Sequence, residues 1–196
     1  MKIFFSRHGQ TRLNHEHLMQ GHMDEPLNDV GRQQAREMRE LLQQRYPGLH
    51  FDAVYSSPLS RAVETAGILS GLPEEEIHKD ERIIEVSFGK YEGKKYSKLG
   101  PAMTLYWALP ELFPAPATVE PISSMTARSS SFLNDILKRK EQTVLVVCHG
   151  GILRSLYGFM EGRRNGIVWR PKPKNCEIRV YEADERGRHL LEKLQK

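Results

Sequence analysis

Short apolar segments alternate along the chain with longer segments whose apolar residues recur every three or four positions. Runs of five or six residues rich in apolar side chains are typical of buried strands, and they occur at 2–6 (KIFFS), 51–56 (FDAVYS) and 143–148 (TVLVVC). A further run, 175–183 (NCEIRVYEA), predicts a late strand at the edge of the sheet. Strands that alternate with helices predict an α/β fold, a three-layer sandwich in which a mostly parallel central sheet has helices on both faces.

The segments between these strands carry helix signals. Asn28 is a good N-cap for a helix whose apolar residues return at helical spacing. Ser57 is expected to cap a second helix, with Pro58 as its first residue. A third helix is predicted at about 123–140, and a fourth follows the strand at 143–148.

The segment from about 88 to 122 breaks this alternation. It is rich in proline and in aromatic residues, namely Phe88, Tyr91, Tyr96, Tyr106, Trp107 and Phe113. We interpret it as an insertion that forms a cap over one end of the sheet, within a single domain that spans residues 1–196.

The composition narrows the class of protein. The chain has 196 residues, charges of both signs and a formal net charge of +4, which excludes disordered and fibrous classes and makes a weak case for a nucleic-acid binder. The longest apolar run, at 144–148, is far too short to cross a bilayer, and the N-terminus lacks the features of a secretory signal. Only two cysteines occur, Cys148 and Cys176, so the fold does not need disulfides. We therefore expect a protein of the reducing cytoplasm that does not bind membranes.

Cationic and imidazole side chains gather where the predicted strands end. Arg7 and His8 follow the first strand, His149 follows the strand at 143–148, and Arg61 lies in the first turn of the helix after the second strand. In an open α/β sheet, ligands bind at the carboxyl ends of the strands, where helix N-termini present free N–H groups. Two guanidiniums and two imidazoles at this edge predict a binding site for a phosphoryl group.

The same residues predict a reaction. An imidazole between two guanidiniums stays neutral near pH 7 because like charge disfavours its protonated form, and a neutral imidazole is a nucleophile. His8 could thus attack phosphorus and form a covalent phosphoramidate, which splits one difficult step into two. The leaving oxygen would then need a proton donor. Glu85 is the candidate, because a neighbouring phosphate dianion favours a protonated carboxyl group.

Five motifs, in this order, resemble those of the histidine phosphatase superfamily, also called the phosphoglycerate mutase-like family. They are RHGQTRLN (7–14), QGHMDEPLNDVGRQQA (20–35), SSPLSRAVETA (56–66), the stretch EVSFGKYEG (85–93) and CHGGILR (148–154). The resemblance covers nearly the whole chain. It implies an enzyme of the phosphatase branch that uses neither metal nor other cofactor and acts on a small phosphate ester.

The resemblance also implies roles for individual residues. His8 would be the phosphorylated nucleophile, and Glu85 would be the general acid and then the base for water. The phosphoryl oxygens would be held by Arg7, Arg61 and His149. Substrate contacts would come from Asn14, Gln20, Gly21 and Gly150.

Two departures from the family pattern bear on the substrate. Many members have a P-G-G-E-[ST] stretch where this chain has EPISSM (120–125), and the segment 97–122 lacks the paired arginines with which the mutases bind a second anion. We therefore expect a phosphate monoester hydrolase. A cofactor-dependent phosphoglycerate mutase is the first alternative, and a non-catalytic module that binds phosphorylated ligands is the second.

The predicted cap suggests what surrounds the leaving group. Its aromatic residues would give a partly apolar wall instead of a second anion site, with some positive charge from Lys94, Lys95 and Lys98. Such a wall predicts a preference for monophosphates with an organic leaving group over bisphosphorylated compounds.

A competing motif overlaps the fifth block. Residues 148–155 fit C-x-x-G-x-x-R-[ST], the phosphate loop of cysteine-dependent phosphatases, in which a thiolate attacks phosphorus. The residue before Cys148 is Val147 where that family has histidine, and Cys148 closes an apolar run, which favours an inert buried thiol. This alternative also leaves the other four motifs unexplained.

Two further clusters have more than one interpretation. His15, His17 and His22 suggest a metal site, but their spacing matches no zinc pattern, so a polar loop at the rim of the site is the better interpretation. The stretch 163–174 contains five basic residues and no acidic one. It is either a solvated loop or a rim that attracts anionic substrates. No motif supports nucleic-acid binding, and the oligomeric state stays open.

Overall fold

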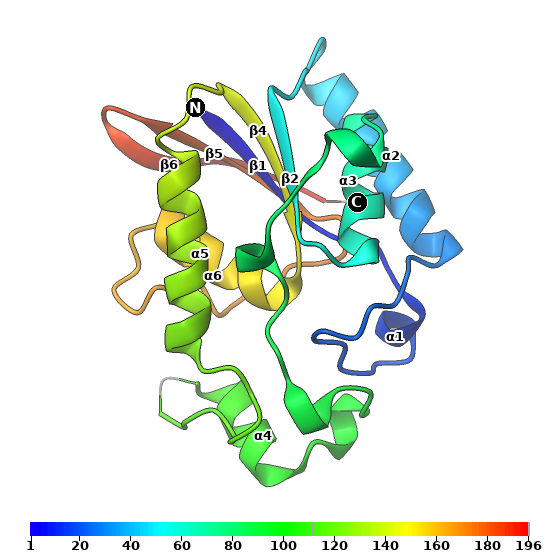
Figure 1. Ribbon diagram of the computed structural model, residues 1–196, viewed down its shortest axis with the longest axis vertical. Helices are drawn as coiled ribbons and strands as arrows, with labels where there is room; N and C mark the ends of the chain where they lie inside the picture. Colours follow the sequence, from blue (N-terminus) through cyan, green and yellow to red (C-terminus); the bar gives the residue numbers. More distant parts are fainter. Residues whose placement is uncertain (111, 196) are drawn as a thin grey trace.

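The computed structural model describes residues 1–110 and 112–195. Figure 1 shows the arrangement of its elements. The helices and strands are β1 (Lys2–Arg7), α1 (Arg12–His15), α2 (Asp29–Arg45), β2 (Ala53–Ser56), α3 (Ser60–Ser70), β3 (His78–Lys79), α4 (Gly100–Ala108), α5 (Ile122–Ile136), β4 (Thr143–Cys148), α6 (Gly150–Met160), β5 (Ile178–Asp184) and β6 (Gly187–Leu194). Short 3₁₀ helices are η1 (Glu74–Glu76), η2 (Glu81–Ile83), η3 (Gly89–Tyr91) and η4 (Tyr96–Lys98).

The strands form one sheet in the order β3-β2-β4-β1-β5-β6. The first four strands of this order are parallel, and β5 and β6 are antiparallel to their neighbours. Helices α2 and α3 cover one face and α5 and α6 the other, so the predicted three-layer α/β fold is confirmed (Figure 1). The register pairs Arg7 of β1 with Cys148 of β4, which places the residues that follow, His8 and His149, side by side at the carboxyl edge.

The prediction that the late strand lies at the sheet edge was wrong. β6 pairs with β5 on its outer side and is itself the edge strand. Most β6 residues are exposed or half-buried, and the strand carries charged side chains, as edge strands commonly do. Because it buries so little, β6 lacks the apolar pattern by which a strand is recognised in sequence.

Of the two predicted helix caps, one is confirmed and one was wrong. The Asn28 side chain accepts a hydrogen bond from Gly31 N and caps α2 as expected. Helix α3, however, begins at Ser60 with Leu59 as its N-cap, and the hydroxyl of Ser57 is hydrogen-bonded to the ring of His149 (2.7 Å) and to the backbone N–H of Leu59 (3.3 Å). The carboxylate of Asp24, from a distant loop, accepts hydrogen bonds from both the backbone N–H and the hydroxyl of Ser60.

The segment 88–122 lies beyond the carboxyl ends of β1 and β4, where Figure 1 draws α4. Its side chains Phe88, Leu99, Met103 and Tyr106 are buried and belong to the same apolar cluster as the inner faces of α5 and α6. A second apolar cluster fills the space between the sheet and α2 and α3. The segment is thus packed onto the main core, which fixes the aromatic side chains that face the strand ends.

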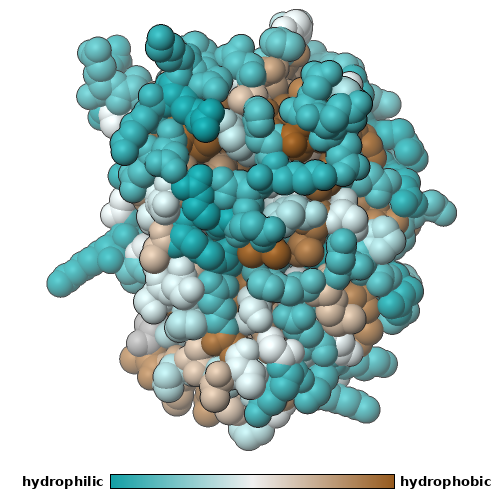
Figure 2. Space-filling model, viewed as in Figure 1, coloured by the Kyte–Doolittle hydropathy of each residue, from teal (hydrophilic) through white to brown (hydrophobic). Residues whose placement is uncertain are grey.

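The surface is mostly polar over the helices and strands, and apolar colours are more frequent near the segment 88–122, which we call the cap segment, at the lower end of the view (Figure 2). The exposed large apolar side chains include Leu105, Leu109 and Leu112 of this segment. Within the residues described, none of the helices combines the length and the hydropathy needed to span a membrane.

Candidate active site

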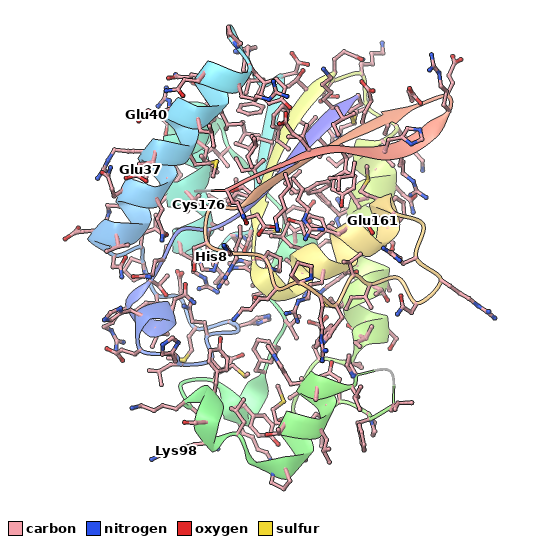
Figure 3. All side chains as sticks on the ribbon, turned by 180° about the vertical axis from the view of Figure 1, so that it is seen from behind. His8, Glu37, Glu40, Lys98, Glu161 and Cys176 are labelled. Atoms are coloured by element: carbon pink, nitrogen blue, oxygen red, sulfur yellow. The ribbon has the colours of Figure 1, made fainter. Side chains whose placement is uncertain are left out.

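A pocket opens at the carboxyl ends of β1 and β4, between the sheet and the cap segment. Figure 3 shows His8 at this position, with Lys98 at the far side of the cap segment. The pocket is lined by Arg7, His8, Asn14, Gln20, Gly21, Arg61, Glu85, Phe88, Tyr96, Trp107, Gly150, Gly151, Arg154 and Lys172. All the site residues expected from the sequence are in this set except His149.

The ring of His8 is held in one tautomer. Its Nδ1 lies 2.7 Å from the carbonyl oxygen of Gly9, and because a carbonyl can only accept, Nδ1 carries the hydrogen. The Nε2 atom is therefore left with its lone pair. Burial, together with the charges of Arg61 and Arg7, holds the pKa of His8 well below its usual value. The ring is consequently neutral near pH 7, as the sequence predicted, with burial as the larger cause.

The loop after β1 has little freedom. His8 N donates to Cys148 O (3.0 Å), and His8 O accepts from the side chain of Asn175 (3.0 Å). The loop also passes so close to α2 that a Cβ on Gly9 would lie 2.5 Å from the carbonyl oxygen of Gly31. Only glycine permits this approach, which fixes the backbone that carries His8.

Arg61 is fully buried, and its donors are used by the protein itself. Its guanidinium donates to the carbonyl oxygens of Met23 (2.7 Å) and Gly21 (2.8 Å) and to Nδ1 of His149 (3.3 Å). Burial lowers its pKa to about 10, which leaves it charged at neutral pH. Glu64, on the same helix, pairs with Arg32 (2.6 Å) and not with Arg61.

Arg7 is the second guanidinium of the pocket. Its Nη1 donates to the carbonyl oxygen of Pro173 (2.9 Å), while its buried Nε has no partner among the described residues. Burial lowers the pKa of Arg7 from its ordinary value. An unpaired buried donor is costly, and an anion in the pocket could supply the missing acceptor.

His149 is the one expected site residue that does not line the pocket. Its ring is fully buried and lies behind the pocket lining, 5.0 Å from the ring of His8 between centroids. Since Arg61 Nε donates to its Nδ1, Nε2 carries the hydrogen and donates to Ser57 Oγ (2.7 Å). Burial and the charge of Arg61 keep the pKa of His149 well below its usual value. In this geometry His149 orients Arg61 and packs behind His8.

Glu85 lies on the N-terminus of α6. Its Oε1 accepts hydrogen bonds from the backbone N–H groups of Gly151 (3.0 Å) and Ile152 (3.1 Å). A helix N-terminus stabilises a carboxylate through its free donors and its dipole. A Cβ on Gly151 would lie 2.5 Å from the Oε1 atom of Glu85, so the second glycine of the H-G-G motif makes room for this carboxylate.

The backbone that carries Glu85 is anchored by two residues whose role was not predicted. Arg128 of α5 donates to the carbonyl oxygens of Arg82 (2.9 Å) and Ile84 (2.6 Å), and it is paired with Glu120 (2.8 Å). His22 Nε2 donates to the carbonyl oxygen of Glu85 (2.8 Å). Thus His22 and Glu120, which belong to the polar loop and to the atypical EPISSM stretch, both support the carboxylate.

Further pocket residues come from outside the expected set. Arg154 lies on α6, and Lys172 belongs to the basic stretch 163–174. Lys94, Lys95 and Lys98, which were expected to add charge near the leaving group, are exposed and do not line the pocket. The aromatic wall is present in Phe88, Tyr96 and Trp107, but its cations come from other elements. Arg154 was visible in the sequence as the arginine of C-x-x-G-x-x-R, whereas nothing local distinguishes Lys172.

Cys148 does not fit the role of a nucleophile. It is fully buried in the apolar cluster beneath α6, and burial raises the pKa of its thiol well above the ordinary value. A neutral thiol in an apolar core is inert. Within residues 1–110 and 112–195, no three His, Cys, Asp or Glu side chains come together as metal ligands would, and this includes the cluster of His15, His17 and His22.

The fold and the pocket together define a phosphatase of the histidine type, in which phosphoryl transfer takes place at the carboxyl end of an α/β sheet. The chain belongs to the histidine phosphatase superfamily (branch 1), whose family model matches residues 3–194.

Several known proteins are similar along most of the chain. Phosphoserine phosphatase 1 of Hydrogenobacter thermophilus is 31% identical over 201 residues, which cover 97% of this chain and 90% of the relative. Phosphoglycerate mutase-like protein 4 of Arabidopsis thaliana is 36% identical over 162 residues, 80% of this chain and 69% of the relative. Among solved structures, Bacillus stearothermophilus YhfR superposes with a TM-score of 0.85 at 31% identity, covering 97% of this chain and 95% of that one.

Proposed function

We propose that this protein hydrolyses small phosphate monoesters through a phosphorylated His8, with Glu85 as the general acid and base. The observation that carries the proposal is the state of His8. Its Nδ1 is bound to Gly9, its ring is neutral, and its Nε2 lone pair lies in a pocket that contains Arg7 and Arg61. This arrangement suits nucleophilic attack on a phosphoryl group whose oxygens are bound by cations.

In the first step, Nε2 of His8 forms a bond to phosphorus while the bond between phosphorus and the leaving oxygen breaks. The leaving oxygen takes the proton of the Glu85 carboxyl group. Arg7 and Arg61 stabilise the equatorial oxygens during transfer. Asn14, Gln20, Gly21 and Gly150 complete the substrate-binding surface, and the segment 88–122 acts as the cap.

In the second step, water attacks phosphorus and the bond between phosphorus and Nε2 breaks. Glu85, now ionised, takes a proton from the water, and inorganic phosphate leaves with His8 restored to its neutral form. The alcohol departs before this step. A mutase would need to keep the alcohol bound and exclude water, so we favour hydrolysis over phosphoglycerate mutase activity.

No metal is needed in this mechanism, because Arg7 and Arg61 supply the positive charge that a cation would otherwise supply. Prolonged EDTA treatment is expected to leave the rate of phosphate release unchanged.

We further propose that the enzyme acts on small molecules in the cytoplasm, without nucleic acid or membrane as a partner.

The test compares His8→Ala with Cys148→Ala in the hydrolysis of p-nitrophenyl phosphate. Loss of the covalent route in His8→Ala is expected to lower turnover by several orders of magnitude, whereas Cys148→Ala is expected to keep most of the activity. An active His8→Ala with an inactive Cys148→Ala would reverse the assignment of the nucleophile. A parallel assay measures the isomerisation of 3-phosphoglycerate in the presence of a bisphosphorylated primer. A mutase would isomerise this substrate faster than the protein hydrolyses its best phosphate ester, whereas a phosphatase would not.

A further inference from the structure

A second cavity, of about 440 Å³, adjoins the pocket that contains His8. It is lined by Tyr96, Leu99, Thr104, Trp107, Ala108, Arg154, Trp169, Arg170 and Lys172. Four of these residues also line the His8 pocket, namely Tyr96, Trp107, Arg154 and Lys172. A substrate whose phosphoryl group lies at His8 would therefore extend its leaving group past these four side chains. We refer to this space as the leaving-group cavity.

Arg154 is a buried guanidinium without a protein partner. Only 5% of its surface is exposed, its Nε is buried without a partner, and its side chain donates no hydrogen bond to any of the described residues. Burial lowers its pKa to about 10, so it is charged at neutral pH. In Arg61, by comparison, all three guanidinium nitrogens donate to protein atoms. An unpaired buried guanidinium is costly unless a ligand binds it.

The two tryptophans explain how Arg154 remains buried and still has free donors. Its guanidinium carbon lies 4.3 Å from the ring centroid of Trp169 and 5.8 Å from that of Trp107. Contacts of this kind stabilise a cation through the ring face, whereas the N–H donors lie in the plane of the guanidinium. Trp169 is fixed in turn, because its Nε1 donates to the carbonyl oxygen of Trp107 (3.0 Å). The guanidinium is thus pre-oriented for a planar anion.

Lys172 adds a second free cation at the same place. The residue as a whole is exposed, but its ammonium nitrogen lies 5.0 Å from the ring centroid of Tyr96 and it lines both cavities. It forms no ion pair with any residue in the described part of the chain. Removal of the ammonium from water, together with the charges of Arg7 and Arg154, lowers its pKa to about 8.

We propose that Arg154 and Lys172 form a specificity site for a carboxylate on the leaving group, whose flat apolar part lies between Tyr96, Trp107 and Leu99 in the leaving-group cavity. The inference rests on the proposed phosphatase function and names its substrate class, a phosphate monoester of a carboxylated, partly apolar alcohol or phenol. This proposal replaces the expectation that the leaving group meets a partly apolar wall without a second anion site.

The balance of charge supports a second anion. The pocket contains the cations Arg7, Arg61, Arg154 and Lys172, while the two histidines are neutral and Glu85 is the proton donor of the proposed first step. A phosphate dianion neutralises two of these four positive charges, which leaves two for a carboxylate. A forked guanidinium binds a carboxylate through two parallel hydrogen bonds, and the ammonium adds a charge that needs no fixed direction.

The test uses matched substrates, phenyl phosphate and 3-carboxyphenyl phosphate, which differ only in the carboxylate. Wild-type enzyme is expected to show at least about tenfold higher kcat/KM for the carboxylated ester, which corresponds to about 1.4 kcal/mol, a modest value for a charged hydrogen-bonded pair. In Arg154→Met and in Lys172→Met this ratio is expected to fall toward one. Arg164→Met, which removes an exposed arginine that lines neither cavity, is the control and is expected to keep the ratio.

Binding provides a readout that does not depend on turnover. Both tryptophans of the chain line the leaving-group cavity, so intrinsic fluorescence reports its occupancy directly. 3-Carboxybenzylphosphonate cannot be hydrolysed. Wild type is expected to bind it at least about tenfold more tightly than benzylphosphonate, whereas Arg154→Met is expected to bind the two phosphonates with equal affinity.

The outcomes separate the two proposals. If wild type shows no preference for the carboxylate, or if Arg154→Met weakens the binding of both phosphonates by the same factor, the specificity site is wrong and Arg154 serves the phosphoryl group. If the carboxylate preference appears in binding but no phosphate is released from either ester, the site stands and the hydrolase function fails.

Discussion

The phosphoryl pocket and the leaving-group cavity share four side chains, yet they are built in opposite ways. Around His8, the two guanidiniums come from the end of β1 and the first turn of α3, and most hydrogen bonds of the polar side chains are made within the protein. Arg61 binds Met23, Gly21 and His149, and Glu85 binds the first turn of α6. Around Arg154, the walls come from α4, the 3₁₀ helix η4 and the stretch 163–174, and the two cations that face the substrate have aromatic rings as neighbours in place of acceptors.

The difference indicates which region determines chemistry and which determines specificity. Groups that must hold one geometry during phosphoryl transfer are fixed by the scaffold before substrate arrives, which avoids reorganisation in the transition state. Groups that recognise the leaving group keep their donors free and lie on segments that can change without disturbing the sheet. Substitutions in the first region should therefore affect every substrate, and those in the second only some.

The largest effect is expected for Arg61→Ala. The variant removes a cation from the phosphoryl group and leaves two buried carbonyl oxygens and the His149 ring without their donor, so kcat/KM is expected to fall by about 10³ or more. The loss should be equal for phenyl phosphate and 3-carboxyphenyl phosphate in steady-state assays. A loss confined to one of the two esters would break the proposed division.

Glu85→Gln sharpens the comparison through the basicity of the leaving group. An alkyl phosphate needs a proton donor, so its hydrolysis is expected to fall by about 10²–10³. p-Nitrophenolate leaves without a proton, so the phosphorylation step with p-nitrophenyl phosphate should be much less affected. The measurement is the pre-steady-state rate of each ester in the variant and in wild type. Equal losses in this step for both esters would contradict a role for Glu85 as the acid.

Acid should weaken the phosphoryl pocket through its buried histidines. Burial, with the charge of Arg61, depresses the pKa of both His8 and His149. The unfolded chain binds protons below about pH 6.5 and the folded chain does not, so the free energy of unfolding should fall by up to about 1.4 kcal/mol per pH unit for each histidine as the pH drops below that value.

His8→Asn should remove one of these two contributions. Urea unfolding at pH 7.5, 6 and 5 is expected to give a shallower dependence in this variant than in wild type, with little difference in slope above pH 7. An unchanged slope would mean that His8 is protonated in the folded protein.

The smallest effect is expected for Trp169→Leu. Loss of the ring face beside the Arg154 guanidinium removes about 1 kcal/mol, so KM for 3-carboxyphenyl phosphate should rise about fivefold, with most of the change in KM and not in kcat. Trp107 then becomes the single fluorophore for the binding titration. A large loss of kcat would place Trp169 in the chemistry, against the division proposed for the two regions.

The site could be predicted where its residues follow strands directly. Arg7 is the last residue of β1, and His8 and Gly150 lie just beyond β1 and β4; a parallel sheet brings such positions together whatever the loops do. His149 lies at the same edge, but its ring points behind the pocket, which depends on its hydrogen bonds to Arg61 and Ser57.

The leaving-group cavity could not be predicted in the same way. Arg154 is the fifth residue of a helix, and Lys172 lies in a basic stretch with no local pattern. Their meeting with Tyr96 and Trp107 depends on how the cap segment packs, a tertiary contact between segments far apart in the chain. For the same reason β6, which buries little, was missed.

The central claim is that His8 itself carries the phosphoryl group. Rapid mixing of Glu85→Gln with p-nitrophenyl phosphate tests it most directly, because formation of the intermediate needs no acid while its hydrolysis needs the missing base. We predict a burst of one p-nitrophenolate per enzyme molecule and, after quenching in alkali, a phosphoryl group on the peptide that contains His8. In the double variant Glu85→Gln/His8→Ala, we predict that no burst occurs. A burst that persists without His8, or a phosphoryl group found on Cys148, would contradict it.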